Sequence, residues 1–182
     1  MTDPVHQQLK VHMCKSAFER MQAHCHSRTD VEVCGVLLGT ISESDGEWTC
    51  TISDVIEGEH ASEKGVSVTF THQTWNHVHT IMDSLEDDTK MVGWFHTHPG
   101  FGIFYSNQDA FIQNQFFNEV WMPGIVVDPI ADDLGVFHCH EDSIRRLGSL
   151  SITDDDGELL EEIKSNYKPS RPASAVTTSE NT

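Results

Sequence analysis

Four polar residues near the middle of the chain have the types and the spacing of a metal site. His96 and His98 stand two residues apart, and after seven further residues Ser106 and Asp109 follow as Ser-x-x-Asp. The histidines come directly after the apolar run 91–95, which predicts a buried strand, and residues two apart on a strand point to the same face. Both imidazoles can therefore reach one metal ion. Two histidines and one carboxylate leave a fourth tetrahedral position open, which is typical of a catalytic zinc site.

The same pattern also has a purely structural interpretation. Pro99 and Gly100 end the predicted strand, and Ser106 then looks like the N-cap of a helix whose apolar residues lie between 111 and 116. Ser-x-x-Asp resembles an ordinary capping signature, and a histidine pair arises easily in a chain with 12 His. We favour the metal site because the predicted order of strand, turn and helix is the context that such a motif requires.

The four residues match the motif of the JAMM/MPN+ metalloproteases, which are also called JAB or Mov34/MPN/PAD-1 domains. That family also has a glutamate on an upstream strand beside a Gly-rich apolar run, and Glu32 followed by 33–39 supplies it. A glutamate before a strand is by itself more often a solvated edge residue, so its weight comes from the pairing with the histidine motif. The resemblance extends over roughly residues 9–140, and all five motif positions are intact, which distinguishes the chain from inactive members that have lost ligands.

The resemblance implies a zinc-dependent hydrolase of amide or isopeptide bonds. Zinc held by His96, His98 and Asp109 would lower the pKa of its bound water from 15.7 to about 7. Glu32 would act as the general acid and base, and the Ser106 hydroxyl would help to stabilise the oxyanion. The implied substrate is the C-terminal Gly-Gly tail of ubiquitin or a ubiquitin-like protein, joined to a lysine amine or to a short extension.

The segment 101–105 would then flank the cleavage channel. The alternative interpretation places two of its three aromatic rings in the core beside the zinc-binding helix. The connections between residues 118 and 135 are short, which predicts no insertion with a second zinc and gives no basis for naming a linkage. In this compactness the chain resembles the stand-alone prokaryotic members, which act on ubiquitin-like or sulfur-carrier proteins.

Two other functions compete with the protease. In the first, an MPN fold serves as a binding module for assembly and its site is idle or masked; the intact Glu32 argues against this, because a scaffold needs no general base. The second is the related RadC-type family, which is linked to DNA. A formal net charge of -18 makes it the weakest interpretation, because nucleic acid attracts positively charged surfaces.

Two further groups of histidines invite a metal interpretation. His72, His77 and His79 fall on a predicted helix, but His77 lies off the stripe of the other two, so we interpret them as surface residues. In the run 138–140, successive strand residues alternate between faces, so Cys139 cannot readily join its two histidine neighbours at one metal. We therefore interpret this run as structural and not as a metal site.

Apolar periodicity predicts the elements that position the site. The resemblance implies an α+β (α/β) fold in which a central mixed, mostly antiparallel β-sheet is flanked by helices: the MPN/JAB fold, which is cytidine deaminase-like. Strands are predicted near 9–13, 33–38, 48–52, 66–70, 91–95, 124–128 and 135–139, and helices near 18–25, 75–85 and 106–116.

Length and composition predict one domain with a tail in a chain of 182 residues. We expect residues 1–141 to form the metalloprotease domain. The remaining 142–182 is rich in Ser, Asp, Glu and Thr, which predicts a disordered tail apart from a short helix at Leu159 to Lys164.

Five scattered cysteines predict free thiols in a reducing cytoplasm. The sequence shows neither a standard export signal nor a run of 18 apolar residues. We expect a cytoplasmic protein with ubiquitin or ubiquitin-like conjugates as partners and without nucleic acid or membrane partners. The sequence does not indicate an oligomeric state.

Overall fold

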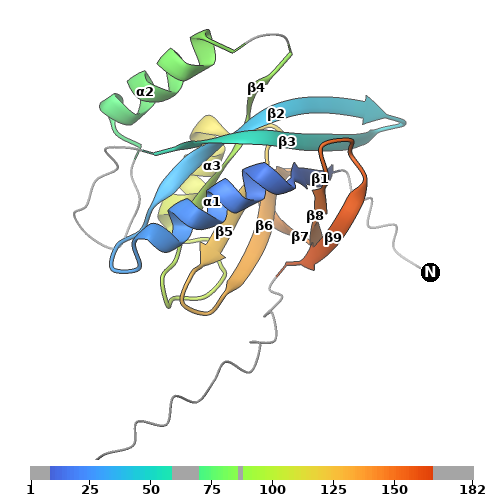
Figure 1. The fold of residues 1–182 in the computed structure, drawn as a ribbon. Helices are drawn as coiled ribbons and strands as arrows, with labels where there is room; N and C mark the ends of the chain where they lie inside the picture. Colours follow the sequence, from blue (N-terminus) through green and yellow to red (C-terminus); the bar gives the residue numbers. More distant parts are fainter. Residues whose placement is uncertain (1–8, 59–69, 86–87, 166–182) are drawn as a thin grey trace, which may run out of the picture.

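The computed structural model describes residues 9–58, 70–85 and 88–165, which form nine strands and three helices (Figure 1). The elements are β1 (Leu9–Cys14), α1 (Lys15–Ser27), β2 (Cys34–Ser44), β3 (Glu47–Glu57), α2 (His72–Asp83), β4 (Lys90–Thr97), α3 (Asn107–Phe116), β5 (Gly124–Asp128), β6 (Asp133–His140), β7 (Ser143–Leu147), β8 (Ser149–Thr153) and β9 (Leu159–Lys164).

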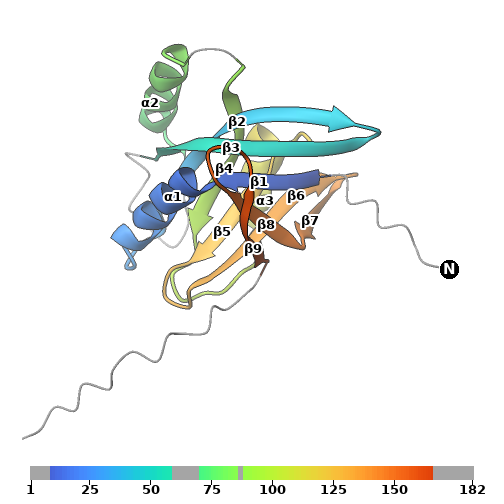
Figure 2. The same cartoon turned by 45° about the vertical axis from the view of Figure 1, so that its right-hand side comes forward.

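All nine strands belong to one mixed sheet with the order β7-β6-β5-β4-β2-β3-β1-β8-β9. The pairs β1–β3, β1–β8 and β4–β5 are parallel, and the other five pairs are antiparallel. The sheet is strongly curved (Figure 2). Just after the end of β9, the Ser165 hydroxyl accepts a hydrogen bond from the Val136 amide of β6 at 3.1 Å. The predicted α+β class and the mixed, mostly antiparallel sheet are confirmed.

Helices cover both faces of the sheet, and the alternation of side chains along β4 shows why the metal motif faces α3. Phe95 packs into the core cluster that contains Met21 of α1. Trp94 packs into the second cluster, with Val78 of α2 and Ile112 of α3. Because strand residues alternate between faces, the residue two beyond Trp94 points to the α3 side. That residue is His96.

The C-terminal part of the described chain corrects the expected domain boundary at residue 142. Residues 143–164 form β7, β8 and β9. β7 pairs with β6, β8 pairs with β1, and β9 pairs with β8. Leu150 and Ile163 are buried in the core cluster on the α1 face. The segment expected to be a short helix, Leu159–Lys164, is the edge strand β9. Composition failed here because backbone pairing with distant strands orders these polar strands. The end of the expected tail, 166–182, lies outside the described residues.

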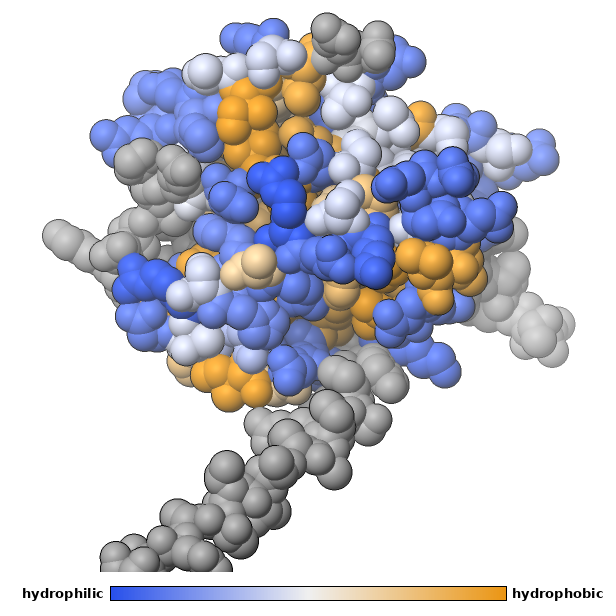
Figure 3. Space-filling model, viewed as in Figure 1, coloured by the Kyte–Doolittle hydropathy of each residue, from blue (hydrophilic) through white to orange (hydrophobic). Residues whose placement is uncertain are grey.

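The predicted strand 66–70 lies outside the described residues apart from Phe70, which precedes α2. All five cysteines are unpaired, as expected. Within the described ranges, no helix is long and apolar enough to cross a membrane. The face drawn in Figure 3 is mostly hydrophilic with separate hydrophobic patches.

Candidate metal centre and active site

The two histidines at the end of β4 meet inside the protein. His96 lies within β4 and His98 just after it, and their side chains are 0% and 2% exposed. Their Nε2 atoms are 3.2 Å apart. The His96 ring stacks on the Trp94 indole with centroids 4.3 Å apart and an angle of 11° between the planes. Strand geometry therefore brings the two imidazoles together, and the indole fixes the plane of one of them.

The third member of the cluster comes from the first turn of α3. Ser106 is the N-cap, and its hydroxyl accepts a hydrogen bond from the Asp109 amide at 3.1 Å. The Asp109 carboxylate accepts from the Ser106 amide at 2.8 Å, which completes a capping box. The same carboxylate lies 3.2 Å from His96 Nε2 and 3.0 Å from His98 Nε2. The capping signature and the metal motif are thus one arrangement in which the cap aims Asp109 at the histidines.

The donor atoms fit a metal ion by their chemistry. The ligand atoms of His96, His98 and Asp109 all lie within 4.8 Å of one another, and all three residues are buried. His98 Nδ1 lies 3.2 Å from the Gly102 carbonyl oxygen. Since a carbonyl can only accept, this nitrogen carries the proton and Nε2 keeps its lone pair for a metal. Two imidazole nitrogens and a carboxylate oxygen suit zinc. The cluster could therefore hold a metal ion.

The protonation states of His96 and Asp109 follow from burial and from their contacts within the cluster. Burial lowers the pKa of His96 and so favours its neutral form. Burial alone would raise the pKa of Asp109, but hydrogen bonds with His96 and His98 hold it well below its ordinary value. The ligand set thus contains an ionised carboxylate and a neutral imidazole at neutral pH, which are the forms that bind metals.

Glu32 reaches the same place from the segment just before β2. Its side chain is 9% exposed, and its Oε1 lies 4.0 Å from His98 Nε2. The next residue, Val33, is hydrogen-bonded to Thr97 at the end of β4. The Val33 amide donates to the Thr97 hydroxyl at 2.8 Å, and the Thr97 amide donates to the Val33 carbonyl at 2.9 Å. The structure therefore brings together all five residues that the sequence singled out.

A hollow of about 380 Å³ opens beside this cluster. Phe101 and Phe104 line its apolar side and are 59% and 45% exposed. The third aromatic residue of the segment, Tyr105, stacks on Phe137 in the interior with ring centroids 4.4 Å apart. The alternative with two rings in the core is therefore wrong, because only one ring packs there. The remaining lining residues are Glu32, His98, Ser106, Asn107 and Gln108.

Two buried residues that support the site were not found from the sequence. Gln113 on α3 accepts hydrogen bonds from the Trp94 indole at 2.6 Å and from the Tyr105 hydroxyl at 2.8 Å. Asp128 at the end of β5 accepts from backbone amides of the loop after His98. A lone polar residue in an apolar pattern was the only signal at either position.

The other histidines within 9–58, 70–85 and 88–165 form no comparable cluster. Among the described residues, only His96, His98 and Asp109 make a group of three potential metal ligands. In β6, the buried His138 is hydrogen-bonded to the Val120 carbonyl at 2.9 Å, whereas Cys139 on the other side of the strand contacts Asn114. The structural assignment of the run 138–140 agrees with these contacts.

Comparisons with known proteins support the same interpretation of the fold and the motif. Residues 6–120 match the family described as JAB1/Mov34/MPN/PAD-1 ubiquitin protease. The chain is 28% identical over 138 residues to COP9 signalosome complex subunit 5 of Caenorhabditis elegans, covering 71% of this chain and 36% of that protein. It is 32% identical over 124 residues to the ubiquitin carboxyl-terminal hydrolase RPN11 of Saccharomyces cerevisiae, covering 66% and 39%.

A solved structure shows the same fold at lower sequence identity. The solution structure of protein DSY2949 from Desulfitobacterium hafniense superposes with a TM-score of 0.59 and 17% identity, covering 80% of this chain and 94% of that one. The chain spans less than two fifths of the length of the two curated relatives named above. The family match covers more than half of the chain and includes every residue of the cluster, so the chain belongs to the JAB1/Mov34/MPN/PAD-1 family.

Proposed function

We propose that this protein is a zinc metalloprotease that hydrolyses the amide or isopeptide bond after the C-terminal Gly-Gly of ubiquitin or a ubiquitin-like protein. The observation that carries the proposal is the position of Glu32. Its mostly buried side chain lies beside a candidate metal cluster and also lines the adjoining hollow. A scaffold has no need of a carboxylate there, whereas a hydrolase needs a proton carrier between the metal and the substrate.

His96, His98 and Asp109 would hold the zinc ion through the atoms that converge in the structure. When bound, zinc supplies a Lewis acid that polarises a carbonyl and makes water acidic enough to ionise near neutral pH. The hydrogen bond between His98 and the Gly102 carbonyl holds one ligand ring in the required tautomer. Stacking on Trp94 holds the plane of the other ring.

Glu32 would move the proton during hydrolysis. A carboxylate oxygen of Glu32 takes a proton from the attacking water and later delivers it to the nitrogen of the departing amine. Its place beside the ligand strand is maintained by the pair of hydrogen bonds between Val33 and Thr97. One residue could serve both steps because Glu32 lies beside the cluster and also lines the adjoining hollow.

Ser106 would donate a hydrogen bond to the oxyanion of the tetrahedral intermediate. Its oxygen accepts the capping hydrogen bond from the Asp109 amide, and a hydroxyl that accepts in this way still has its own proton to donate. Ser106 also lines the hollow beside the cluster. The capping role and the catalytic role are therefore compatible.

The substrate class is supported by the shape of the site and by the names of similar proteins. Phe101 and Phe104 form an apolar wall on the hollow, next to the buried His98 and the mostly buried Glu32. A peptide passing this wall must approach the cluster closely, which favours residues without side chains before the scissile bond. The family description refers to a ubiquitin protease, and one relative is named as a ubiquitin carboxyl-terminal hydrolase.

The five free thiols favour a reducing compartment such as the cytoplasm.

Replacing Ser106 with alanine is expected to lower the turnover rate by about 100-fold to 1000-fold, by analogy with the loss of one oxyanion donor. The lost helix cap should also cost about 1 kcal/mol of folding stability. Thr71→Ala is the matched control, because Thr71 caps α2 in the same way at 3.1 Å from the Thr74 amide. A rate loss in both variants, in proportion to stability alone, would leave Ser106 with only its capping role.

The substrate assignment is tested with matched fusions that differ in one residue before the scissile bond. A ubiquitin-like protein ending in Gly-Gly and joined to a short extension should be cleaved, whereas the same fusion ending in Gly-Ala should be cleaved far more slowly because a side chain clashes near the metal. Time courses on the two fusions give the comparison. Equal rates would indicate a peptidase with broader specificity and would remove the ubiquitin-like substrate from the proposal.

A further inference from the structure

The carboxylate of Asp128, at the end of β5, accepts hydrogen bonds from two separate loops. The side chain is buried, with the residue 2% exposed. Its Oδ1 accepts hydrogen bonds from the amides of Gly100 at 2.9 Å, Ile130 at 3.0 Å and Ala131 at 3.1 Å. Its Oδ2 accepts from the Gly102 amide at 3.1 Å. Two of these bonds hold the turn after β5, and the other two hold the loop that follows the metal motif.

The loop after His98 has a backbone shape that only glycine adopts without strain. Gly100 and Gly102 have φ angles of 77° and 84°, in the left-handed region. These conformations present both amides to Asp128. The Gly102 carbonyl oxygen in turn lies 3.2 Å from His98 Nδ1. A continuous series of hydrogen bonds therefore runs from Asp128 through the peptide groups of Gly102 to the ring of a candidate metal ligand.

We propose that Asp128 is a positioning residue for the metal site: it holds the Gly100–Gly102 loop so that the Gly102 carbonyl fixes the tautomer and orientation of His98. This inference rests on the proposed zinc site. Partners of metal-bound imidazoles orient the ligand and raise its basicity, and their loss typically weakens metal binding by roughly 10-fold to 100-fold.

The charge of Asp128 is consistent with this role. Burial alone would raise the pKa of Asp128, but the four backbone N–H groups that point at it lower the pKa below its ordinary value. An ionised carboxylate offers acceptors on both oxygens. It can therefore hold amides of the loop and of the turn at the same time, which a neutral amide in its place cannot do equally well.

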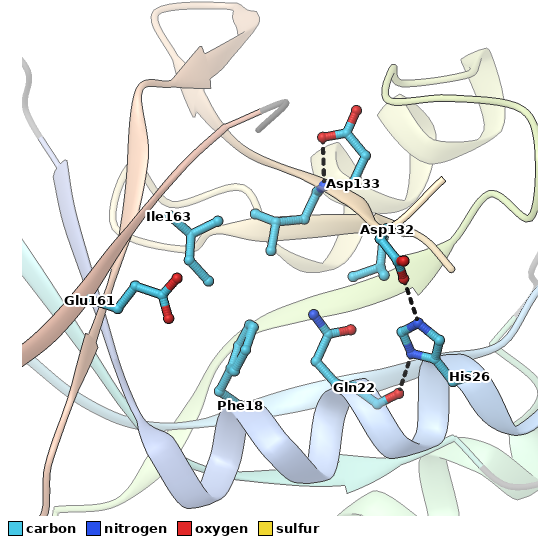
Figure 4. Close-up of a pocket in the computed structure, with 9 residues that line it drawn as sticks. Phe18, Gln22, His26, Asp132, Asp133, Glu161 and Ile163 are labelled. Atoms are coloured by element: carbon cyan, nitrogen blue, oxygen red, sulfur yellow. Dashed lines mark hydrogen bonds and ion pairs between the residues drawn. The ribbon is translucent and has the colours of Figure 1, made fainter. Parts of the chain in front are cut away.

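In a simpler role, Asp128 would only stabilise the turn after β5. This role can be distinguished from positioning of His98 because Asp132 lies in the same turn and contacts α1. Asp132 Oδ1 lies 3.3 Å from His26 Nε2 of α1, and both residues line a separate hollow of about 240 Å³ (Figure 4). Phe18 and Gln22 of α1 point into this hollow in the same view. Asp132 thus ties the turn to α1 without contacting the Gly100–Gly102 loop through any hydrogen bond found among the described residues.

The first comparison is therefore Asp128→Asn against Asp132→Asn in the full-length chain. Zinc affinity is measured by competition with a chromophoric chelator, and the cobalt-substituted proteins are compared by their visible absorption. Asp128→Asn should bind zinc about 10-fold to 100-fold more weakly and show an altered cobalt spectrum. Asp132→Asn should resemble the wild type in both measurements.

A second pair of variants keeps the test valid if Asp128→Asn folds poorly. A Cβ on Gly102 would meet no atom within 4 Å, so Gly102→Ala strains the backbone of the loop without a steric clash. Gly46, in the hairpin between β2 and β3, has a φ of 80° and equally open surroundings. Gly102→Ala should weaken zinc binding, whereas the equally strained Gly46→Ala should not.

Each outcome bears on a different claim. Wild-type zinc affinity in both Asp128→Asn and Gly102→Ala would overturn the positioning role and leave the proposed protease intact. Equal weakening in Asp128→Asn and Asp132→Asn would also overturn it, because the turn alone would then account for the effect. A wild-type protein that binds zinc but hydrolyses nothing would remove the proposed function and leave the positioning role standing, whereas a wild type that binds no zinc would overturn both.

Discussion

Replacing Glu32 with glutamine is expected to leave the zinc content and the fold unchanged and to lower the hydrolysis rate by about 100-fold to 10,000-fold. Glutamine has nearly the same shape, but its neutral amide cannot accept the proton of the attacking water. Because Glu32 is not one of the three converging ligands, zinc should remain bound. Metal content, circular dichroism and single-turnover cleavage rates are the measurements needed.

The matched control for this substitution is Glu43→Gln, which removes the same charge from an exposed position near the far end of β2, the strand that follows Glu32. It should retain the wild-type rate. If Glu32→Gln also cleaved at nearly the wild-type rate, Glu32 would be a structural residue and another group would have to carry the proton. If it lost zinc, Glu32 would belong to the ligand set.

Replacing Asp109 with asparagine is expected to remove most of the bound zinc and, with it, the activity. The substitution preserves the side-chain shape but removes the negative charge that faces His96 and His98 at 3.2 and 3.0 Å. Two neutral imidazoles alone make a poor zinc site, since catalytic zinc is held by three protein ligands. Elemental analysis of the purified variant should show far less than one zinc ion per chain.

His96→Ala and His79→Ala complete this metal-binding test. His96→Ala should lose zinc in the same way as Asp109→Asn. His79, exposed on α2, lies outside the cluster and should be dispensable. A full equivalent of zinc in both His96→Ala and Asp109→Asn would contradict the ligand assignment, whatever the effect on cleavage.

The local geometry of the candidate site could be predicted from the sequence because each part depends on neighbours in the chain. Residues two apart on a strand share a face, so His96 and His98 had to converge once 91–95 formed β4. The capping signature placed Asp109 on the first turn of α3, and this cap is what aims its carboxylate. Glu32 was different: it is separated from the motif by many residues, so only the family resemblance indicated that it joins the site.

The features that sequence patterns missed depend on contacts between distant segments. The strands within 143–164 are short and rich in polar residues, so their order comes from pairing with β1 and β6 and from burial of a few side chains such as Leu150. Asp128 looked like the polar end of a buried strand. Its contacts with the loop 99–102 depend on the tertiary fold, because the amides of Gly100 and Gly102 donate to its carboxylate only when the loop folds back over β5.

We propose that this chain uses a metal held at the cluster to cut after Gly-Gly, and a single cleavage assay can establish whether it does. The purified full-length protein is incubated with a ubiquitin-like fusion bearing a C-terminal extension in three states: as isolated with zinc, after zinc has been removed by a chelator, and after zinc has been restored. We expect cleavage at the Gly-Gly junction in the first state, none in the second, and recovery in the third. Cleavage that persists at full rate in the zinc-free protein, or a zinc-loaded protein that leaves the fusion intact, would contradict it.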